Sequence, residues 1–325
     1  SQSPIHIIGA GAFGTALASV WLKAGRDVTL WCRDRAQAQG LAVEGLNSKV
    51  PAAPKLNGIK AGTLDDFELT DPSSVVVLAV KARAQASVYA ALCPPLPSAC
   101  QIVTASKGFA NEQGALLSEQ ITPPNGLHIL SGPSFADDLF ANRPTALTLA
   151  SEHASPSLSA LLSSPLLRIY QSTDPIGVQI CGAMKNVIAI ACGCSIGLGL
   201  GASARSALMT RGLREIERVV TLYGGSVRTA SGLAGIGDLA LTCQDADSRN
   251  YRFGLALGRG DDLSAILAQN ITVEGADTAR GLRDGSRTSG IDLPISHAVA
   301  DLIDGKADRT EVITKLLDRA LTQDV

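Results

Sequence analysis

One charged side chain lies inside a long apolar stretch, where it could carry acid–base chemistry. The stretch from Ile176 to Ile196 reads IGVQICGAMKNVIAIACGCSI, and Lys185 is its only residue with a formal charge. Moving an ammonium group out of water is costly and lowers its pKa, so such a lysine needs a partner or serves as a proton donor or acceptor. The alternative is that Lys185 extends along apolar surface to reach water and does no chemistry.

Two loops that follow this stretch carry further polar side chains of the kind found in ligand sites. The segment 232–238 reads GLAGIGD, a glycine-rich approach to the single acid Asp238. Ser248, Arg249 and Asn250 stand together at the expected start of a helix. An arginine with polar neighbours in this position could bind a small anion, preferably a phosphate gripped by two parallel hydrogen bonds.

The apolar stretch around Lys185 is long enough to span a bilayer, but we expect it to be a buried helix. Its flanks carry no belt of Trp and Tyr and no basic cluster, and several glycines interrupt it. The surrounding sequence has ordinary polarity. We therefore predict a large core and no stable membrane insertion.

The beginning of the chain carries a dinucleotide-binding pattern. A predicted strand, Ile5–Ile8, is followed at once by GAGAFG, residues 9–14, and by a helical run from Thr15 to Lys23. Gly9 permits a tight turn, Gly11 lets the backbone approach a pyrophosphate, and Gly14 lets helix and strand pack closely. A glycine-rich structural turn is the alternative, but the strand, turn and helix in this order favour nucleotide binding.

The end of the second predicted strand, Val28–Cys32, bears on the choice of cofactor. Asp34 stands near the place where NAD-preferring sites put an acid against the ribose hydroxyls. Arg33 precedes it, and an arginine there can hold a 2′-phosphate. We therefore expect NADP(H) to be preferred, with NAD(H) also possible; a solvated surface charge is the alternative.

Further apolar runs predict a doubly wound α/β sheet. The predicted strands cover residues 75–80, 102–105, 128–130, 145–149 and 168–170. Lys107, Gly132 and Ser134 follow the carboxyl ends of two of them, where open α/β sheets bind ligands. Lys107 is the best candidate for a substrate contact, while Gly132 and Ser134 could present a backbone N–H and a hydroxyl, or form a plain helix cap.

The alternation of strands and helices ends after this sheet, and the remaining sequence is predicted to be helical. We expect residues 1–173 to form a Rossmann-like dinucleotide-binding domain and residues 174–325 to form an all-helical domain for substrate binding and catalysis. The helix that carries Lys185 would then open the second domain.

Composition and charge limit the possible partners. The 325 residues are 46% hydrophobic and 18% charged, with a net charge of −2, which fits a globular protein and argues against nucleic acid as a partner. Seven scattered cysteines and four widely separated histidines predict reduced thiols and no metal site. Reduced thiols suit a reducing cytosol, and no basic segment precedes an apolar one near residue 1, so we expect a cytoplasmic protein with no visible signal peptide.

Seven motifs in order resemble the soluble nicotinamide-dependent glycerol-3-phosphate dehydrogenases, most closely the bacterial branch of that family. They are GAGAFGTALA, ASKG, SGPSFA, GAMKNVIAI, GLAGIGDLALTC, SRN and VEG, and together they cover nearly the whole chain. The resemblance implies reversible reduction of dihydroxyacetone phosphate, a small phosphorylated substrate, to sn-glycerol 3-phosphate for glycerophospholipid synthesis. It also implies a cytoplasmic homodimer.

The resemblance assigns roles to particular residues. The family's catalytic lysine falls on Lys185, the proton donor in reduction and the acceptor in oxidation. The substrate positions fall on Lys107, Gly132, Ser134, Asp238, Ser248, Arg249 and Asn250. The cofactor positions fall on Ala12, Phe13, Arg33, Lys107, Ala136, Arg249, Thr272 and Glu274.

Physical reasoning adds roles beside the resemblance. Lys185 as an ammonium would stabilise and protonate the alkoxide that forms when hydride reaches a carbonyl carbon. Asp238 could hold Lys185 and keep it charged, and is therefore a second catalytic candidate. Asn186 and Thr242 could orient the reacting group, and Arg249 could grip the phosphate.

Two positions depart from the family pattern. Relatives usually have an acid at the position of Ile196, and often a serine at that of Ala12. The first difference could alter the tuning of Lys185, whereas a backbone N–H at Ala12 can still bind a pyrophosphate.

Two other classes of function stay open at this point. A β-hydroxyacid or 6-phosphogluconate type dehydrogenase also joins a Rossmann domain to a helical one and uses a helix lysine. A nucleotide-binding regulator without turnover would share the fold, since fold alone does not imply catalysis.

Overall fold

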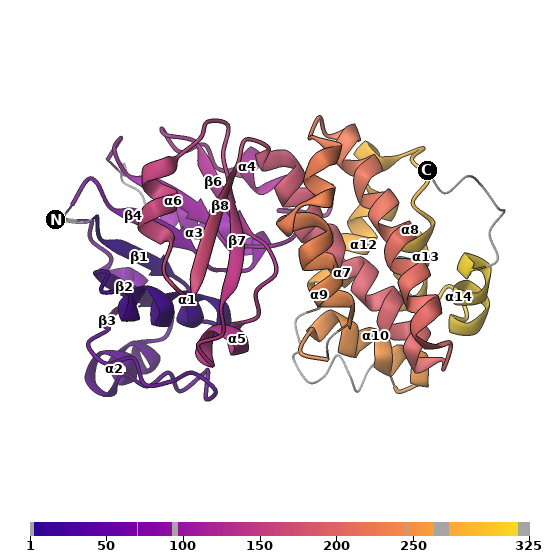
Figure 1. Ribbon diagram of the computed structural model, residues 1–325, viewed down its shortest axis with the longest axis horizontal. Coiled ribbons are helices and arrows are strands. Elements are labelled where there is room, and N and C mark those ends of the chain that lie inside the picture. Colours follow the sequence, from indigo (N-terminus) through magenta and orange to yellow (C-terminus); the bar gives the residue numbers. More distant parts are fainter. Residues whose placement is uncertain (1–2, 70, 93–96, 245, 263–272, 318–325) are drawn as a thin grey trace. The chain divides into compact units, whose positions relative to one another are not determined.

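Strands and helices alternate through the first half of the chain, and helices alone follow (Figure 1). The structure is a computed structural model that describes residues 3–69, 71–92, 97–244, 246–262 and 273–317. The chain divides into one unit of Ser1–Ala110 with Leu116–Gln179 and a second of Asn111–Ala115 with Ile180–Val325. The predicted domain boundary at 173/174 stays a proposal, and the long helix α7 begins just after it at Pro175.

The first unit is built on one eight-stranded sheet in the described part of the chain. Its order is β3-β2-β1-β4-β5-β6-β7-β8, and every neighbouring pair is parallel except β6 and β7. The strands are β1 Ile5–Ile8, β2 Val28–Cys32, β3 Lys60–Thr63, β4 Val75–Leu78, β5 Gln101–Thr104, β6 Leu127–Ser131, β7 Thr145–Ala150 and β8 Leu167–Ser172. The predicted α/β class with a Rossmann-like sheet and a helical second part is confirmed.

Burial explains which strands the sequence revealed. All four residues of β1 and of β4 are buried, as expected for central parallel strands covered on both faces. Strand β3 was not predicted from the sequence, because Lys60-Ala61-Gly62-Thr63 contains no apolar run. This edge strand pairs with β2, and its Gly62 leaves room for the ring of Trp31.

Six described helices flank this sheet (Figure 1). They are α1 Ala12–Lys23, α2 Arg35–Glu44, α3 Gln85–Ala91, α4 Leu117–Gln120, α5 Ala136–Phe140 and α6 Pro156–Leu162. Helix α1 buries most of its length and packs against α5. Its fully buried Trp21 donates from Nε1 to the carbonyl oxygen of Leu162 over 2.7 Å, which fixes α1 to the end of α6.

The described part of the second unit is helical (Figure 1). Its helices are α7 Pro175–Gly197, α8 Gly201–Leu222, α9 Asp238–Gln244, α10 Arg249–Arg259, α12 Glu274–Asp284, α13 Pro294–Ile303 and α14 Arg309–Leu317. Among the described residues α7 is the one helix long and apolar enough to cross a membrane, and 89% of its most apolar window is buried inside the protein. That burial is the environment of a core helix.

Glycines let α7 and α10 pack backbone against backbone. A Cβ atom added to Gly193 or Gly197 of α7 would collide with the backbone of α10. One added to Gly254 or Gly258 of α10 would collide with the backbone of α7. Side chains at the contact set the distance between helices, so these four glycines fix α10 closely against the helix that carries Lys185.

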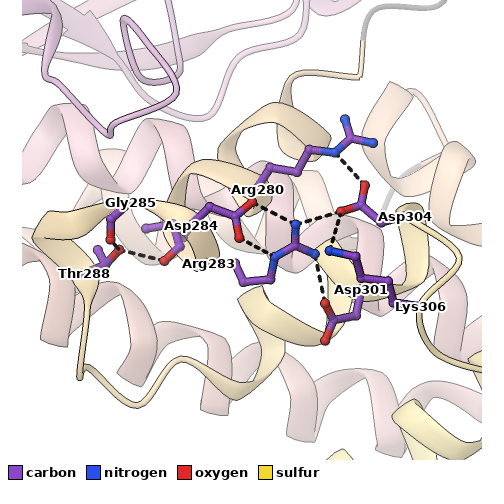
Figure 2. A network of polar contacts seen from close by, with 9 residues as sticks. Arg280, Arg283, Asp284, Gly285, Thr288, Asp301, Asp304 and Lys306 are labelled. Carbon is purple, nitrogen blue, oxygen red and sulfur yellow. Dashed lines mark hydrogen bonds and ion pairs between the residues drawn. The ribbon is translucent and has the colours of Figure 1, made fainter.

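An arginine-centred cluster joins α12 to α13 (Figure 2). The Arg283 guanidinium donates to Asp284, Asp301 and Asp304 over 2.8, 2.9 and 2.7 Å. Arg280 donates to the other oxygen of Asp304 over 2.8 Å. The hydrogen bond from Arg283, followed by that from Arg280, lowers the pKa of Asp304 to about 2. The cluster therefore stabilises the position of α12.

We predict that Asp304→Asn lowers the free energy of unfolding by about 1 kcal/mol at pH 7, because two charge-assisted hydrogen bonds weaken at a site partly open to water. Because the pKa of Asp304 is lowered in the folded protein, its carboxylate stabilises the fold at pH values above the ordinary pKa of 3.8. This contribution is lost as the pH falls toward 2. Urea unfolding should thus show a smaller deficit at pH 3 than at pH 7. The matched control is Asp277→Asn, whose carboxylate lies 3.9 Å from Arg280 and is half exposed; an equal deficit there would contradict the assignment.

Candidate active site

The glycine turn after β1 has the shape of a phosphate-binding loop. Gly9 has a φ of +111°, and a Cβ there would collide with the carbonyl oxygen of Ala79. A Cβ on Gly14 would collide with the carbonyl oxygen of Gly9, whereas one on Gly11 would meet nothing within 4 Å. Packing therefore requires two of these glycines, and the third leaves the backbone open to a ligand.

The start of α1 is equally suited to an anion. Gly11 is the N-cap and makes no capping bond through a side chain, and the first turn contains no acidic residue. The N–H groups of this turn carry the partial positive charge of the helix end. Ala12 is exposed in this turn, so replacing the serine of many relatives removes a hydroxyl but leaves the backbone donor in place.

Lys107, Phe13 and Gly132 come together in the first unit although they are far apart in sequence. The Nζ of Lys107 donates to the carbonyl oxygen of Gly132 over 3.1 Å and lies 6.0 Å from the centre of the Phe13 ring. Gly132 has a φ of +144°, a conformation that favours glycine. The hydroxyl of Ser134 is buried and makes no hydrogen bond within the described residues, and Ala136 opens α5 beside the core.

Buried polar residues hold the backbone in front of Lys107, and two of them, Gln85 and Thr104, were not predicted from the sequence. The hydroxyl of Thr104 donates to the side-chain oxygen of Gln85, which is fully buried at the start of α3. The N–H of Ser106 donates to the Thr104 hydroxyl over 3.1 Å, and the Ser106 hydroxyl donates to the carbonyl oxygen of Val80 over 2.6 Å. The only sequence signal was the position of Thr104 and Ser106 at the end of an apolar strand, and Gln85, seven residues beyond β4, carried none.

Lys185 and Asp238 form a buried ion pair in the second unit. Lys185 is 6% exposed in the middle of α7, and its Nζ donates to Oδ1 of Asp238, which is 1% exposed. Asp238 is the first residue of α9 and directly follows the π-helical turn η4, Leu233–Gly237. The alternative in which Lys185 reaches bulk water without a partner is therefore excluded.

Neighbouring groups support the acid and enclose the pair. The hydroxyl of Thr242 donates to the carbonyl oxygen of Asp238 over 2.6 Å and lies 3.4 Å from its Oδ1. Burial, with a hydrogen bond to Cys192, raises the pKa of the Cys243 thiol well above its ordinary value. A thiol in this state stays neutral, so Cys243 contributes no competing charge beside the ion pair.

The start of α10 contacts the start of α12. Ser248 caps α10, since its hydroxyl accepts from the N–H of Tyr251 over 3.2 Å. The side-chain oxygen of Asn250 accepts from the N–H of Gly275 over 3.0 Å, and Gly275 also packs against the backbone of Asn186, next to Lys185.

The remaining predicted positions differ in exposure. Arg249 is exposed at the start of α10, and Arg33 is exposed after β2. Asn186 is buried beside Lys185, and Glu274 is half-buried at the start of α12. Thr272 lies outside the described residues.

The expected effect of Ile196 on Lys185 stays a prediction, and the spacing of the two residues along α7 favours a weak effect. Both residues lie on the continuous helix α7, and eleven residues of helix separate them by roughly 16 Å along its axis. Lys185 has its carboxylate from Asp238 instead. Among the described residues, no group of three or more His, Cys, Asp and Glu side chains could hold a metal ion.

The fold and the glycine turn define a two-unit dinucleotide-binding protein, and comparisons with known proteins define the family. Residues 4–156 match the model of the NAD-dependent glycerol-3-phosphate dehydrogenase N-terminus, and residues 174–314 match that of its C-terminus. The chain belongs to the NAD-dependent glycerol-3-phosphate dehydrogenase family. The resemblance stated from the sequence motifs is thereby confirmed.

Individual relatives agree over nearly the full length. Glycerol-3-phosphate dehydrogenase [NAD(P)+] of Roseobacter denitrificans is 42% identical over 98% of this chain and 99% of the relative. The enzyme of the same name from Brucella canis is 40% identical over 98% of both chains. A crystal structure of glycerol-3-phosphate dehydrogenase from Coxiella burnetii superposes with a TM-score of 0.88 at 36% identity, covering 98% of this chain and 99% of that one.

We predict that Asp238→Asn lowers the free energy of unfolding by about 3–5 kcal/mol, because it leaves the Lys185 ammonium buried without its counter-charge. The double variant Lys185→Met with Asp238→Asn should regain much of this loss, since it removes both charges. Urea unfolding of the wild type, both single variants and the double variant measures the coupling. A loss in the double variant equal to the sum of the two single losses would show that the pair has no net interaction.

Proposed function

We propose that this protein catalyses the reversible reduction of dihydroxyacetone phosphate to sn-glycerol 3-phosphate with NAD(P)H. The observation that carries the proposal is the buried Lys185–Asp238 pair, because it supplies a positioned proton donor in a chain of this family. The names of relatives 40–42% identical over nearly the full chain support the same reaction.

The proposed chemistry depends on the proton held by Lys185. A bound reduced nicotinamide would supply the hydride that the carbonyl carbon accepts. Lys185 stabilises the negative charge that grows on the carbonyl oxygen and donates a proton to it; in the reverse direction it accepts the proton of the hydroxyl group. Asp238 favours the charged form of Lys185 and fixes the position of its Nζ, while Thr242 restrains Asp238.

The proposed substrate contacts are the residues that the family motifs and the chemistry of the side chains favour. They are Lys107, Gly132, Ser134, Asn186, Thr242, Ser248, Arg249 and Asn250. Two observations support particular roles. The buried hydroxyl of Ser134 makes no hydrogen bond within the described residues. Arg249 is exposed and is the first residue of α10, and the N-terminus of a helix also favours a phosphate.

The proposed cofactor contacts centre on the glycine turn. They are Gly9, Gly11, Ala12, Phe13, Gly14, Arg33, Lys107, Ala136, Arg249, Thr272 and Glu274. We propose that NADP(H) is preferred and NAD(H) also used, because Arg33 is exposed where β2 ends. The relatives support the coarser statement, since their names give NAD(P)+ without a preference.

The wider setting is part of the proposal. We propose a homodimer in the cytoplasm that supplies glycerol 3-phosphate for glycerophospholipid synthesis. The activity is tested directly by adding dihydroxyacetone phosphate and NADPH and measuring the loss of NADPH absorbance. No turnover with bound cofactor would favour a regulator, and turnover only with an unphosphorylated hydroxyacid would favour the β-hydroxyacid dehydrogenases.

We predict that Lys185→Met lowers kcat by at least ~10²-fold, the low end for loss of a general acid, and leaves cofactor binding intact. Methionine keeps the length and apolar bulk but removes the charge and the proton. Single-turnover kinetics with NADPH, together with titration of NADPH fluorescence, separate the chemical step from binding. Normal turnover would show that Lys185 is a structural residue only.

We predict that Arg249→Ala lowers kcat/KM for dihydroxyacetone phosphate by about 10- to 10²-fold, because an exposed arginine loses a charge-assisted hydrogen bond worth about 1.5–3 kcal/mol. Binding energy from the phosphate should also position the carbonyl group for reaction, so turnover falls together with affinity. The control substrate is unphosphorylated dihydroxyacetone at saturating NADPH. An equally large penalty with that substrate would refute a phosphate contact.

A further inference from the structure

Lys49 forms an ion pair with the acid that stands next to Arg33. The Nζ of Lys49 lies 3.1 Å from Oδ2 of Asp34, and the two side chains are 53% and 41% exposed. The other oxygen of Asp34 accepts from the N–H of Gln37 over 2.8 Å and so caps helix α2. Both oxygens of Asp34 are therefore engaged inside the protein, and its charge is offset by a lysine.

This arrangement bears on the ribose end of a dinucleotide. A carboxylate after the second strand favours the ribose hydroxyls of NAD, and it repels the 2′-phosphate of NADP. The charges of Asp34 and Lys49 offset each other, so the exposed Arg33 gives these three residues a net positive charge. The nearby Arg35 is itself 3.8 Å from Asp66, which reduces its contribution.

A buried amide fixes the backbone of Lys49 relative to the glycine turn. The side-chain nitrogen of Asn47, a residue 6% exposed, donates to the carbonyl oxygen of Ala10 over 3.0 Å and to the Thr15 hydroxyl over 2.8 Å. Its side-chain oxygen accepts from the N–H of Lys49 over 3.1 Å and from the side chain of Gln37 over 2.8 Å. Gln37 donates to the same Ala10 carbonyl oxygen over 2.9 Å.

These bonds join the two ends of a dinucleotide site within one unit. Ala10 lies in the glycine turn, Thr15 lies in α1, and Gln37 lies in the first turn of α2 that Asp34 caps. A buried and fully bonded amide network is rigid, because breaking any one bond leaves a polar group unsatisfied. The backbone of Lys49, from which its side chain extends, is therefore held in a fixed position relative to the glycine turn.

We propose that Lys49 is a specificity-determining residue for the cofactor: it offsets the charge of Asp34 and, with Arg33, makes the end of β2 accept the 2′-phosphate of NADP(H). The inference rests on the proposed function and deepens its cofactor preference. It assigns a role to a residue outside the glycine turn and outside the seven family motifs. The effect is electrostatic at an exposed site, so it must weaken as salt screens it.

The direct test compares the dissociation constants of NADPH and NADH by nucleotide fluorescence in wild type and in Lys49→Met. Loss of the charge that offsets Asp34 should raise the constant for NADPH by about 5-fold, the effect of one unit charge about 4 Å away in bulk water. The constant for NADH should change by less than ~2-fold, because it has no 2′-phosphate. Unchanged NADH binding also shows that the variant is folded and that the loop is intact.

The matched control is Lys60→Met. Lys60 also pairs with an aspartate, its Nζ lying 2.7 Å from Asp27, but Asp27 precedes β2 and Asp34 follows it. The two ion pairs therefore stand at opposite ends of the same strand. Lys60→Met should leave the ratio of the two dissociation constants unchanged, and an equal effect there would overturn the role of Lys49.

Removal of the acid tests the mechanism by which Lys49 acts. Asp34→Asn keeps an acceptor for the α2 cap and should tighten NADPH in wild type and recover part of the loss in Lys49→Met. Lys49→Arg should keep the preference. The difference between Lys49→Met and wild type should shrink from low to high salt. Equal weakening of NADPH and NADH by Lys49→Met, or no recovery on adding Asp34→Asn, would overturn the proposal.

Arg33→Ala separates failure of this inference from failure of the proposed function. If Arg33→Ala weakens NADPH selectively and Lys49→Met does not, the NADP(H) preference stands and the role of Lys49 is refuted. If the wild type binds NADH as tightly as NADPH, the preference itself is refuted. Reduction of dihydroxyacetone phosphate is assayed with both cofactors at saturation, so the reaction is judged independently of either result.

Discussion

The buried ion pair of Lys185 and Asp238 is the interaction on which the second unit depends. Several kcal/mol oppose the burial of each charge, so the pair persists only if its geometry is held by the surrounding structure. Helix α7 supplies a rigid position for the lysine, and the π-helical turn before α9 brings the acid to it. The Thr242 hydroxyl and the close packing of α10 on α7 then restrict both partners.

The first unit meets an equivalent constraint with neutral groups. The glycine turn must keep its backbone open, so it cannot be stabilised by side chains of its own. Its support comes from outside: the amides of Gln37 and Asn47 both donate to the Ala10 carbonyl oxygen. In each unit, buried polar side chains hold the proposed ligand-binding groups in place, and removing such a side chain leaves an unsatisfied polar group in the core.

Much of this organisation was predictable from the sequence. Apolar runs gave the central strands β1 and β4, and glycines after β1 gave the turn, because these features follow from local periodicity and backbone conformation. The edge strand β3 and the polar network of Gln85 were missed, since they depend on neighbours far along the chain. The partner of Lys185 could not be predicted with certainty for the same reason. Ile196 is eleven positions away on the same helix and therefore roughly 16 Å distant, whereas Asp238 reaches Lys185 from another helix.

The hydroxyl groups within the family motifs differ in whether they make a hydrogen bond within the protein. Ser248 caps α10 and Thr242 bonds to the backbone of Asp238, so each has a structural bond to maintain whether or not a ligand is bound. Ser134 is buried, and its hydroxyl has no bond within the described residues, a state that costs free energy unless another molecule satisfies it. A motif alone does not distinguish these cases. The unsatisfied hydroxyl is the stronger structural argument for a ligand, because folding by itself gives no reason to keep it.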